Sequence, residues 1–169
     1  MHLARLQTPL GEMLLAASDH ALVGAWFLGQ KHFPSFSEAE VRGAPLIVSG
    51  GESSSVPLGL AAKEFEDFFA GSLRKFSIPL APKGTAFQQR IWEALQTIPC
   101  GESRSYGQVA ALAGAQGAYR AAGAAIGKNP ISVIIPCHRA LGAKGALTGY
   151  AGGLDRKKRL LELEGLAIA

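Results

Sequence analysis

The chain has 169 residues, of which 48% are hydrophobic and 18% are charged, and its formal net charge is +4. This length is enough to bury the core of one domain or of two small ones, and the composition excludes a disordered or fibrous protein. The longest apolar runs fall well short of the ~20 residues that cross a bilayer, so we expect no membrane-spanning segment.

The charge is unevenly distributed along the chain. Residues 1–82 carry 6 Lys and Arg against 8 Asp and Glu, whereas residues 83–169 carry 11 against 5. The basic half, with its run Arg156–Arg159, has the electrostatic character of a domain that binds a polyanion, above all nucleic acid. A solvated basic surface would give the same pattern, so charge alone leaves both interpretations open.

The cysteine and histidine content limits the possible sites. Two cysteines, Cys100 and Cys137, exclude a disulfide-rich scaffold and suit a reducing compartment. The first residues lack a long apolar stretch followed by a small-residue cleavage site, which predicts a cytoplasmic protein. The four histidines show no metal-ligand spacing, so we expect neither a metal nor a cofactor.

The first third of the chain is predicted to be an antiparallel meander of strands separated by turn signals. Its apolar-rich runs are His2–Gln7, Glu12–Ala17 and Leu22–Phe27. Residues 43–58, rich in Gly, Ser and Pro, are predicted to be a surface loop, and Leu60–Phe69 has helical spacing. Ile78–Pro82 is a predicted linker between an N-terminal domain (1–82) and a second domain (83–169).

The second half is predicted to be helical. Thr85 with Gln88, and Ser105 with Gln108, have the spacing of capping boxes that open two helices. Gly114 ends the second of these.

A third helix follows a short connection, so the pair forms a helix-turn-helix pattern. This helix should run from about Ala118 to a point near Asn129, because Pro130 follows. It consists almost entirely of small residues around Arg120, unlike the polar helices that read bases in the major groove. Such a face fits either tight packing against another helix or close approach to a DNA minor groove.

After the helix-turn-helix pair, the sequence predicts an extended segment, a wing-like segment and a final helix. Ile131–Ile135 is predicted to be extended, and Gly142–Gly153 to be a wing-like segment. Asp155 is the predicted N-cap of a final helix that ends at Gly165.

The segment Pro136–Arg139 is where the sequence predicts chemistry. Cations or a base beside a cysteine lower the thiol pKa from about 8.5 and favour the nucleophilic thiolate, and Cys137 is followed by His138 and Arg139. On extended backbone neighbouring side chains point to opposite sides, so we expect His138 to act on Cys137 through a water. Glu164 is the candidate acid that orients His138. The alternative is a structural cysteine beside a surface histidine.

Together these features resemble the O6-alkylguanine-DNA alkyltransferases, also called methylated-DNA–protein-cysteine methyltransferases. The resemblance covers residues 83–166 closely and the N-terminal part more loosely, through Thr8–Gly11 and the strand pattern. The closely matching segments are Ser105–Ala110, Arg120, Asn129–Pro130, Pro136–Arg139, Gly149–Leu154 and Glu164–Gly165. The resemblance implies an α+β fold with a small, RNase H-like N-terminal sheet-and-helix domain and a winged helix-turn-helix C-terminal domain.

The resemblance implies repair of double-stranded DNA by transfer of an alkyl group, such as methyl, from O6 of guanine to Cys137. Because the thioether is permanent, each molecule would act once, as a methylated-DNA–[protein]-cysteine S-methyltransferase. His138, polarised by Glu164, would deprotonate Cys137 through a water. Tyr106 would donate to guanine N3, and Asn129 would brace the turn before the cysteine.

The resemblance also implies how DNA is bound. Arg120 would fill the space left by a flipped nucleotide, with the small-residue helix in the minor groove. The other expected DNA contacts are Ser105, Ala121, Gly123, Ala124 and Lys128, and the expected pocket residues are Ser132, Ala140, Tyr150, Ala151 and Gly152. The partner is DNA containing O6-alkylguanine, bound by a monomer. Activity on O4-alkylthymine and the preferred alkyl group stay open.

The sequence departs from the family pattern at three pocket positions. Ala151 stands where some members have Ser, Ser132 where some have a second Pro, and Ala140 where Val is more usual. The zinc-binding set of some relatives has no counterpart, since residues 1–99 contain no Cys, and Cys100 is expected to be structural. The alternatives are a non-catalytic protein that binds alkylated DNA, against which Cys137 argues, and a Cys-His-Glu hydrolase, which leaves the helix-turn-helix unexplained.

Overall fold

The computed structural model describes residues 1–48, 51–53 and 55–168. The chain divides into two compact units, Met1–Pro82 and Lys83–Ala169. Both units mix helices and strands, so the expected α+β fold class is confirmed. Among the described residues, no helix has the length and apolar character needed to cross a bilayer.

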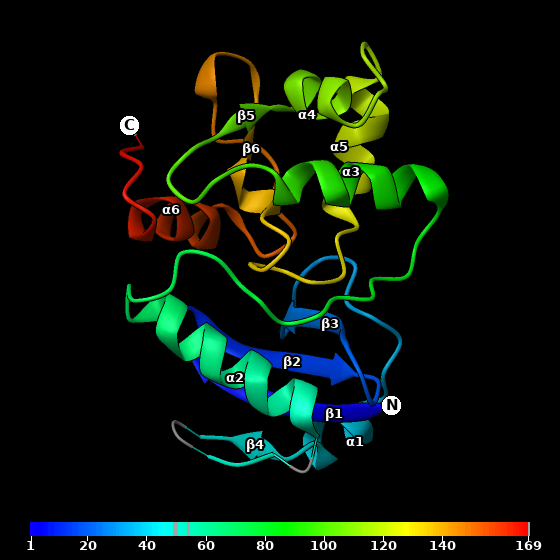
Figure 1. Cartoon of the computed structure of the whole chain (residues 1–169), viewed down its shortest axis with the longest axis vertical. Helices are drawn as coiled ribbons and strands as arrows, with labels where there is room; N and C mark the ends of the chain where they lie inside the picture. The colour runs from blue at the N-terminus through cyan, green and yellow to red at the C-terminus, as the bar shows by residue number, and fades with distance from the viewer. Residues whose placement is uncertain (49–50, 54, 169) are drawn as a thin grey trace. The chain divides into compact units, whose positions relative to one another are not determined.

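Unit 1 is built on a four-stranded sheet with the strand order β3-β2-β1-β4 (Figure 1). Strands β1 (His2–Thr8), β2 (Gly11–Ala17) and β3 (Leu22–Phe27) pair antiparallel, which confirms the predicted meander. The short β4 (Leu46–Ile47) pairs parallel to β1 at the sheet edge.

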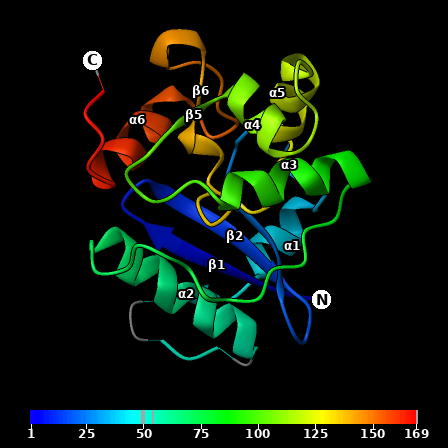
Figure 2. The ribbon, with the colours of Figure 1, turned by 45° about the horizontal axis from the view of Figure 1, so that its top comes forward.

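Both faces of this sheet are covered, which buries most of β2. Helix α2 (Val56–Phe69) lies along one face, as Figures 1 and 2 show. On the other face Trp26 packs against Phe33, with ring centroids 6.3 Å apart, close to α1 (Glu38–Gly43). Gly24 makes room for Trp26, because a Cβ at position 24 would lie 1.9 Å from the indole ring.

Two predictions for unit 1 were wrong in detail. The predicted loop 43–58 contains β4, which is fixed to the sheet edge because the Arg5 amide donates to the Pro45 carbonyl at 2.8 Å. Helix α2 begins at Val56, earlier than predicted, because Pro57 in the first helical turn lacks only an N–H that would have no intrahelical partner there.

The predicted linker Ile78–Pro82 is instead tied to unit 1. The Leu22 amide donates to the Pro79 carbonyl at 2.9 Å, and the Ala81 amide donates to the Leu22 carbonyl at 2.8 Å. Backbone pairing therefore adds this segment to the edge strand β3.

Unit 2 contains four helices within the described residues: α3 (Ala86–Gln96), α4 (Tyr106–Leu112), α5 (Tyr119–Gly127) and α6 (Leu154–Leu163). The two predicted capping boxes are both formed, at the starts of α3 and α4. Trp92 of α3 is buried, and its Nε1 donates to the Ala125 carbonyl of α5 at 2.9 Å. This bond fixes the second helix of the helix-turn-helix pair to α3.

Short elements connect these helices. Strand β5 (Arg104–Ser105) pairs parallel with β6 (Ala140–Leu141), and the 3₁₀ helices are η1 (Cys137–Arg139) and η2 (Ala143–Gly145). The predicted wing, 142–153, is a loop that contains η2.

The predicted N-cap of the last helix was wrong. Gly153, at φ +92°, is the N-cap of α6, and Asp155 lies in the first helical turn. Glycine reaches this left-handed conformation without strain, and the acidic side chain still lies near the positive end of the helix.

Candidate active site

Cys137 lies on a turn that the Asn129 side chain stabilises. Residues 131–135 form a hydrogen-bonded turn, with Val133 at φ +73°, so the predicted extended segment was wrong. The Asn129 Oδ1 accepts from the Ile131 amide at 2.9 Å, and its Nδ2 donates to the Ile135 carbonyl at 2.8 Å. Because the side chain satisfies backbone groups at both ends of the turn, the chain reverses and enters η1 at Cys137.

The thiol of Cys137 is buried and therefore protonated at rest. Only 5% of the residue is exposed. Burial raises the pKa of Cys137, while the Asn129 side chain and the positive charge of Lys157 act in the opposite direction. We expected a lowered pKa from the adjacent His138 and Arg139; this was wrong, because loss of hydration outweighs the favourable neighbours.

His138, Glu164 and Arg139 form a buried hydrogen-bonded group. The His138 Nε2 lies 2.7 Å from the Glu164 Oε1, and Arg139 donates to the same carboxylate from Nε at 3.0 Å and Nη2 at 2.8 Å. Burial by itself would raise the pKa of Glu164, but the hydrogen bonds from His138 and Arg139 hold it at about 2. Glu164 is therefore a carboxylate and His138 Nε2 is its donor.

This tautomer leaves the other histidine nitrogen free to act as a base. Burial lowers the pKa of His138, so the imidazole is neutral at neutral pH. Its Nδ1 is buried and has no hydrogen-bond partner among the described residues. The lone pair of His138 Nδ1 can thus accept a proton from a bridging water.

The expected pocket residues are buried or half-buried. Ser132 and Ala140 are buried, Gly152 is buried and Ala151 half-buried. The Tyr150 hydroxyl is buried and has no hydrogen-bond partner among the described residues. Burial raises the pKa of Tyr150, and the negative charge of an ionised Cys137 raises it further, so these two side chains are electrostatically coupled.

Tyr106, at the start of α4, is bonded to the loop that follows η2. Its hydroxyl donates to the Thr148 carbonyl at 2.7 Å. Tyr106 and Thr148 also line a cleft of about 860 Å³ whose wall includes Ser105 and the basic side chains Arg104 and Lys144. Cys137 does not line this cleft.

The small-residue face of α5 is open to solvent. Arg120, Ala121 and Ala124 are exposed, as is Lys128 just after the helix, and Gly123 is half-buried. A Cβ at Gly123 would meet no described atom within 4 Å. The small side chains on this face are therefore not explained by packing against another described helix, and the surface allows close approach of an external partner.

Sequence reasoning did not anticipate the burial of Lys157, which it counted within the basic run Arg156–Arg159. Lys157 is 0% exposed. The signal was present: Lys157 precedes Leu160 by three residues and Leu161 by four, so it lies on the apolar face of α6. The structure also assigns Arg139 to the Glu164 carboxylate, whereas the sequence suggested only that it neighbours the thiol.

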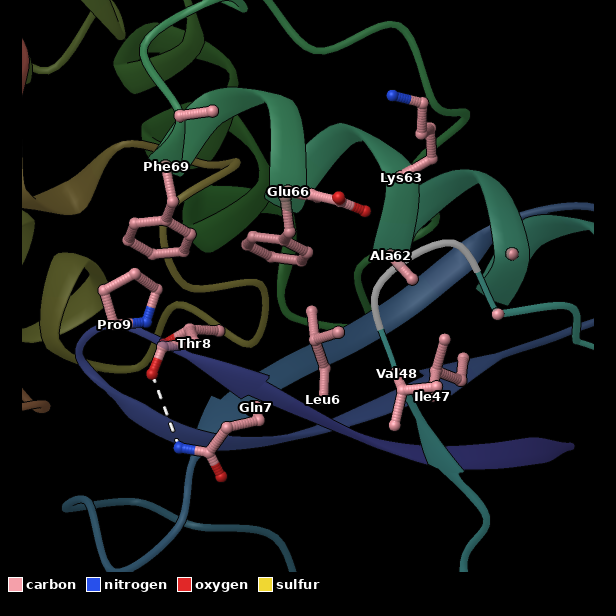
Figure 3. A pocket seen from close by; sticks show the side chains of 14 residues that line it. Leu6, Gln7, Thr8, Pro9, Ile47, Val48, Ala62, Lys63, Glu66 and Phe69 are labelled. Atoms are coloured by element: carbon pink, nitrogen blue, oxygen red, sulfur yellow. Dashed lines mark hydrogen bonds between the residues drawn. The ribbon is translucent and has the colours of Figure 1, made fainter.

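Within the described structure, neither Cys100 nor the cavity of unit 1 combines a cysteine with a histidine and a carboxylate as the Cys137 region does. Cys100 is half-buried, and among the described residues no group of three His, Cys, Asp or Glu could hold a metal. A cavity of about 580 Å³ in unit 1 lies between α2 and the strands, with Leu6, Ile47 and Phe69 in its wall (Figure 3). Its described lining contains neither Cys nor His.

Both units of the chain match domain models of one protein family. Residues 1–82 match the ribonuclease-like domain of 6-O-methylguanine DNA methyltransferase, and residues 86–166 match the DNA binding domain of the same family.

Individual relatives match over nearly the whole chain. The methylated-DNA–protein-cysteine methyltransferase of Mycobacterium tuberculosis (strain ATCC 25618 / H37Rv) is 44% identical over 97% of this chain and 92% of its own length. The Methanosarcina acetivorans protein of the same name is 41% identical over 98% and 99%. The crystal structure of Mycobacterium tuberculosis OGT in complex with DNA superposes with a TM-score of 0.83 at 42% identity, covering 97% of this chain and 92% of the other.

Unit 2, which contains Cys137 and the buried pair of His138 and Glu164, matches the family's DNA binding domain. Unit 1 matches its ribonuclease-like domain. The chain belongs to the 6-O-methylguanine DNA methyltransferase family.

Proposed function

We propose that this chain repairs alkylated double-stranded DNA by moving an alkyl group from O6 of guanine to the sulfur of Cys137. The observation that carries the proposal is a buried pair of side chains: His138, which directly follows the cysteine, and Glu164, whose Oε1 lies 2.7 Å from His138 Nε2. It supplies a base for a thiol that burial keeps protonated. Without such a base, a buried cysteine would be a poor nucleophile.

The reaction balances without a cofactor. A water carries the Cys137 proton to His138 Nδ1, and Glu164 stabilises the imidazolium that forms. The sulfur then attacks the alkyl carbon, the C–S bond forms and the C–O6 bond breaks with its electron pair going to guanine. Tyr106 donates to guanine N3, so the base leaves without a full negative charge. The thioether is permanent, so each molecule acts once.

An alkylated base can reach the buried Cys137 thiol only if residues around the thiol move. Cys137 is 5% exposed and the Tyr106 hydroxyl is engaged by the Thr148 carbonyl at 2.7 Å. We infer that the segment Thr148–Tyr150 shifts when the base enters, which frees Tyr106 for guanine. The backbone of Cys137 and Ala140 then meets the guanine amino group, and the Ala151 amide meets O6.

Unit 2 binds the DNA. The exposed small residues of α5 (Ala121, Gly123 and Ala124) can approach the backbone of a minor groove closely, and Ser105 and Lys128 can contact phosphates at its borders. Arg120 fills the stack after the alkylated nucleotide flips, a step that costs least for a poorly paired base. Residues 1–82 support this domain. We also propose that the chain acts as a monomer in the cytoplasm, where both thiols stay reduced.

The test is a stoichiometric mass change. A duplex carrying one labelled O6-methylguanine is incubated in excess over the protein, and the methyl transferred per protein molecule is counted before the peptides are analysed by mass spectrometry. We expect one methyl group on the peptide that contains Cys137, and none in the variant Cys137→Ser. More than one transfer per protein molecule, or label on another residue, would contradict the proposal.

A further inference from the structure

The cleft of unit 2 has features that the alkyl-transfer scheme does not use, and we call it the basic cleft. It holds about 860 Å³ between the starts of α4 and α5 and the loop that contains η2. Its described lining contains no Asp or Glu, but two cations and two aromatic rings: Arg104, Lys144, Tyr106 and Tyr119. Arg104 already pairs with Glu102 at 3.3 Å, so Lys144 supplies most of the unbalanced positive charge.

Lys144 lies at the tip of a tight turn. The Gly142 amide donates to the Ala146 carbonyl at 2.8 Å, and Lys144 has a φ of +59°, which is disfavoured for a residue with a Cβ. Glycine at position 142 lets the turn close, since a Cβ there would lie 2.9 Å from the Thr148 hydroxyl. Lys144 is exposed and makes no hydrogen bond or ion pair with another described residue. A disfavoured backbone conformation thus holds an unpaired cation at the basic cleft.

Tyr119 is an exposed aromatic residue on the small-residue face of α5. It is the first residue of the helix and lies one turn before Gly123, so the two residues share a face. Tyr119 is 54% exposed, and no ring contact or hydrogen bond joins its side chain to the rest of the described chain. Because Tyr119 lines the basic cleft and directly precedes Arg120, it connects the cleft to the surface that we expect to enter the minor groove.

A cleft with aromatic rings, cations and no acidic side chain in its described wall suits a nucleotide. Its volume lies in the range of ligand clefts, ~300–1,000 Å³. An aromatic ring packs against the sugar and the base, and a lysine neutralises the phosphate.

We propose that the basic cleft holds one nucleotide next to the flipped guanine, an inference that rests on the proposed function. The Tyr119 ring packs against the sugar and the base edge of this nucleotide, beside the gap that Arg120 fills. Lys144 contacts its phosphate. Tyr119 and Lys144 are therefore residues that position the duplex for base flipping, without touching the alkyl group or the thiol.

The first experiment separates stacking from charge. Binding to a duplex with one O6-methylguanine is measured by fluorescence anisotropy over a range of salt concentrations, in a Cys137→Ser background so that no transfer follows. Tyr119→Ala is expected to weaken binding about tenfold at every salt concentration, whereas Tyr119→Phe keeps the ring and should bind normally. Lys144→Ala is expected to reduce the steepness of log K against log salt by about 0.9.

Two exposed side chains of unit 2 that do not line the basic cleft provide matched controls. Leu112→Ala and Lys158→Ala should each leave the affinity and the salt dependence unchanged. Urea unfolding checks that every variant is folded. An unchanged affinity in Tyr119→Ala, or an unchanged salt dependence in Lys144→Ala, overturns the proposal. An equal loss of salt dependence in Lys158→Ala overturns it as well, because the charge effect is then not specific to the cleft.

A second measurement locates the contact. 2-Aminopurine is placed first on one side of the O6-methylguanine and then on the other, and its emission in the complex is compared between Tyr119→Ala and the chain that retains Tyr119. We expect a difference on one side only, since the ring changes the stacking of one base. No difference on either side, or equal differences on both, overturns the placement. Because no transfer is required, failure of the unaltered chain to take methyl from DNA would sink the proposed function and leave these results readable.

Discussion

Glu164→Gln removes the charge that His138 and Arg139 share while it keeps the size of the side chain. In the structure this carboxylate is only 1% exposed and accepts hydrogen bonds from both neighbours. A glutamine offers one acceptor oxygen and directs an NH₂ group toward existing donors. The variant therefore leaves the Arg139 guanidinium, whose side chain is 8% exposed, without a counter-charge.

The magnitude follows from the pKa of Glu164, which is lowered from 4.5 to about 2. A shift of this size corresponds to roughly 3 kcal/mol of stability for the ionised form. Because the pKa is lower in the folded chain than in the unfolded chain, this stabilisation is fully present above pH 4.5. It is lost as the pH falls from 4.5 toward 2. At pH 7 we expect unit 2 of Glu164→Gln to be less stable by roughly 3 kcal/mol.

The assay is urea unfolding followed by the fluorescence of Trp92, in a Trp26→Phe background so that the signal reports unit 2 alone. The difference in unfolding free energy between the unaltered chain and the Glu164→Gln variant should be largest near neutral pH and should shrink toward zero as the pH approaches about 2. Glu162→Gln is the matched control, because this exposed carboxylate lies 3.9 Å from Lys158 and should contribute little. A difference that stays constant over this whole range of pH would refute its electrostatic origin.

Three further variants test separate parts of the site. Tyr106→Phe is expected to slow methyl transfer about tenfold or more, measured in single-turnover experiments, since it removes a donor to guanine N3; an unchanged rate would exclude that role. Arg120→Ala should weaken binding to a duplex with O6-methylguanine while leaving the unfolding free energy within ~0.5 kcal/mol, because the side chain is exposed. Trp92→Phe should cost unit 2 about 1–3 kcal/mol in urea unfolding, since the Ala125 carbonyl loses its buried donor, and a smaller loss would mean that water replaces the indole.

The resting structure explains why the reactive group is protected. Burial keeps the Cys137 thiol protonated, and the Tyr106 hydroxyl is bonded to the Thr148 carbonyl at 2.7 Å. For the single transfer proposed above, such protection matters, because stray oxidants and alkylating agents react with exposed thiolates.

The amino-acid sequence by itself determined the local elements and predicted the residues that carry the proposed chemistry. The capping boxes at Thr85 and Ser105 and the three-stranded meander were predicted correctly, and Glu164 was predicted as the partner of His138. These features depend on neighbours within a few residues, or on a motif whose composition is specific, so they can be read along the chain.

Only the tertiary structure decided the burial and the electrostatic surroundings of these residues. The Cys137 thiol pKa is raised instead of lowered, residues 131–135 turn because Asn129 bonds both ends of the segment, and Lys157 of a basic run is buried against carbonyls that precede it by 8 to 17 residues. The hydration that a group loses, and the donors it meets, depend on segments that folding brings together from separate parts of the chain. No pattern within one segment contains that information.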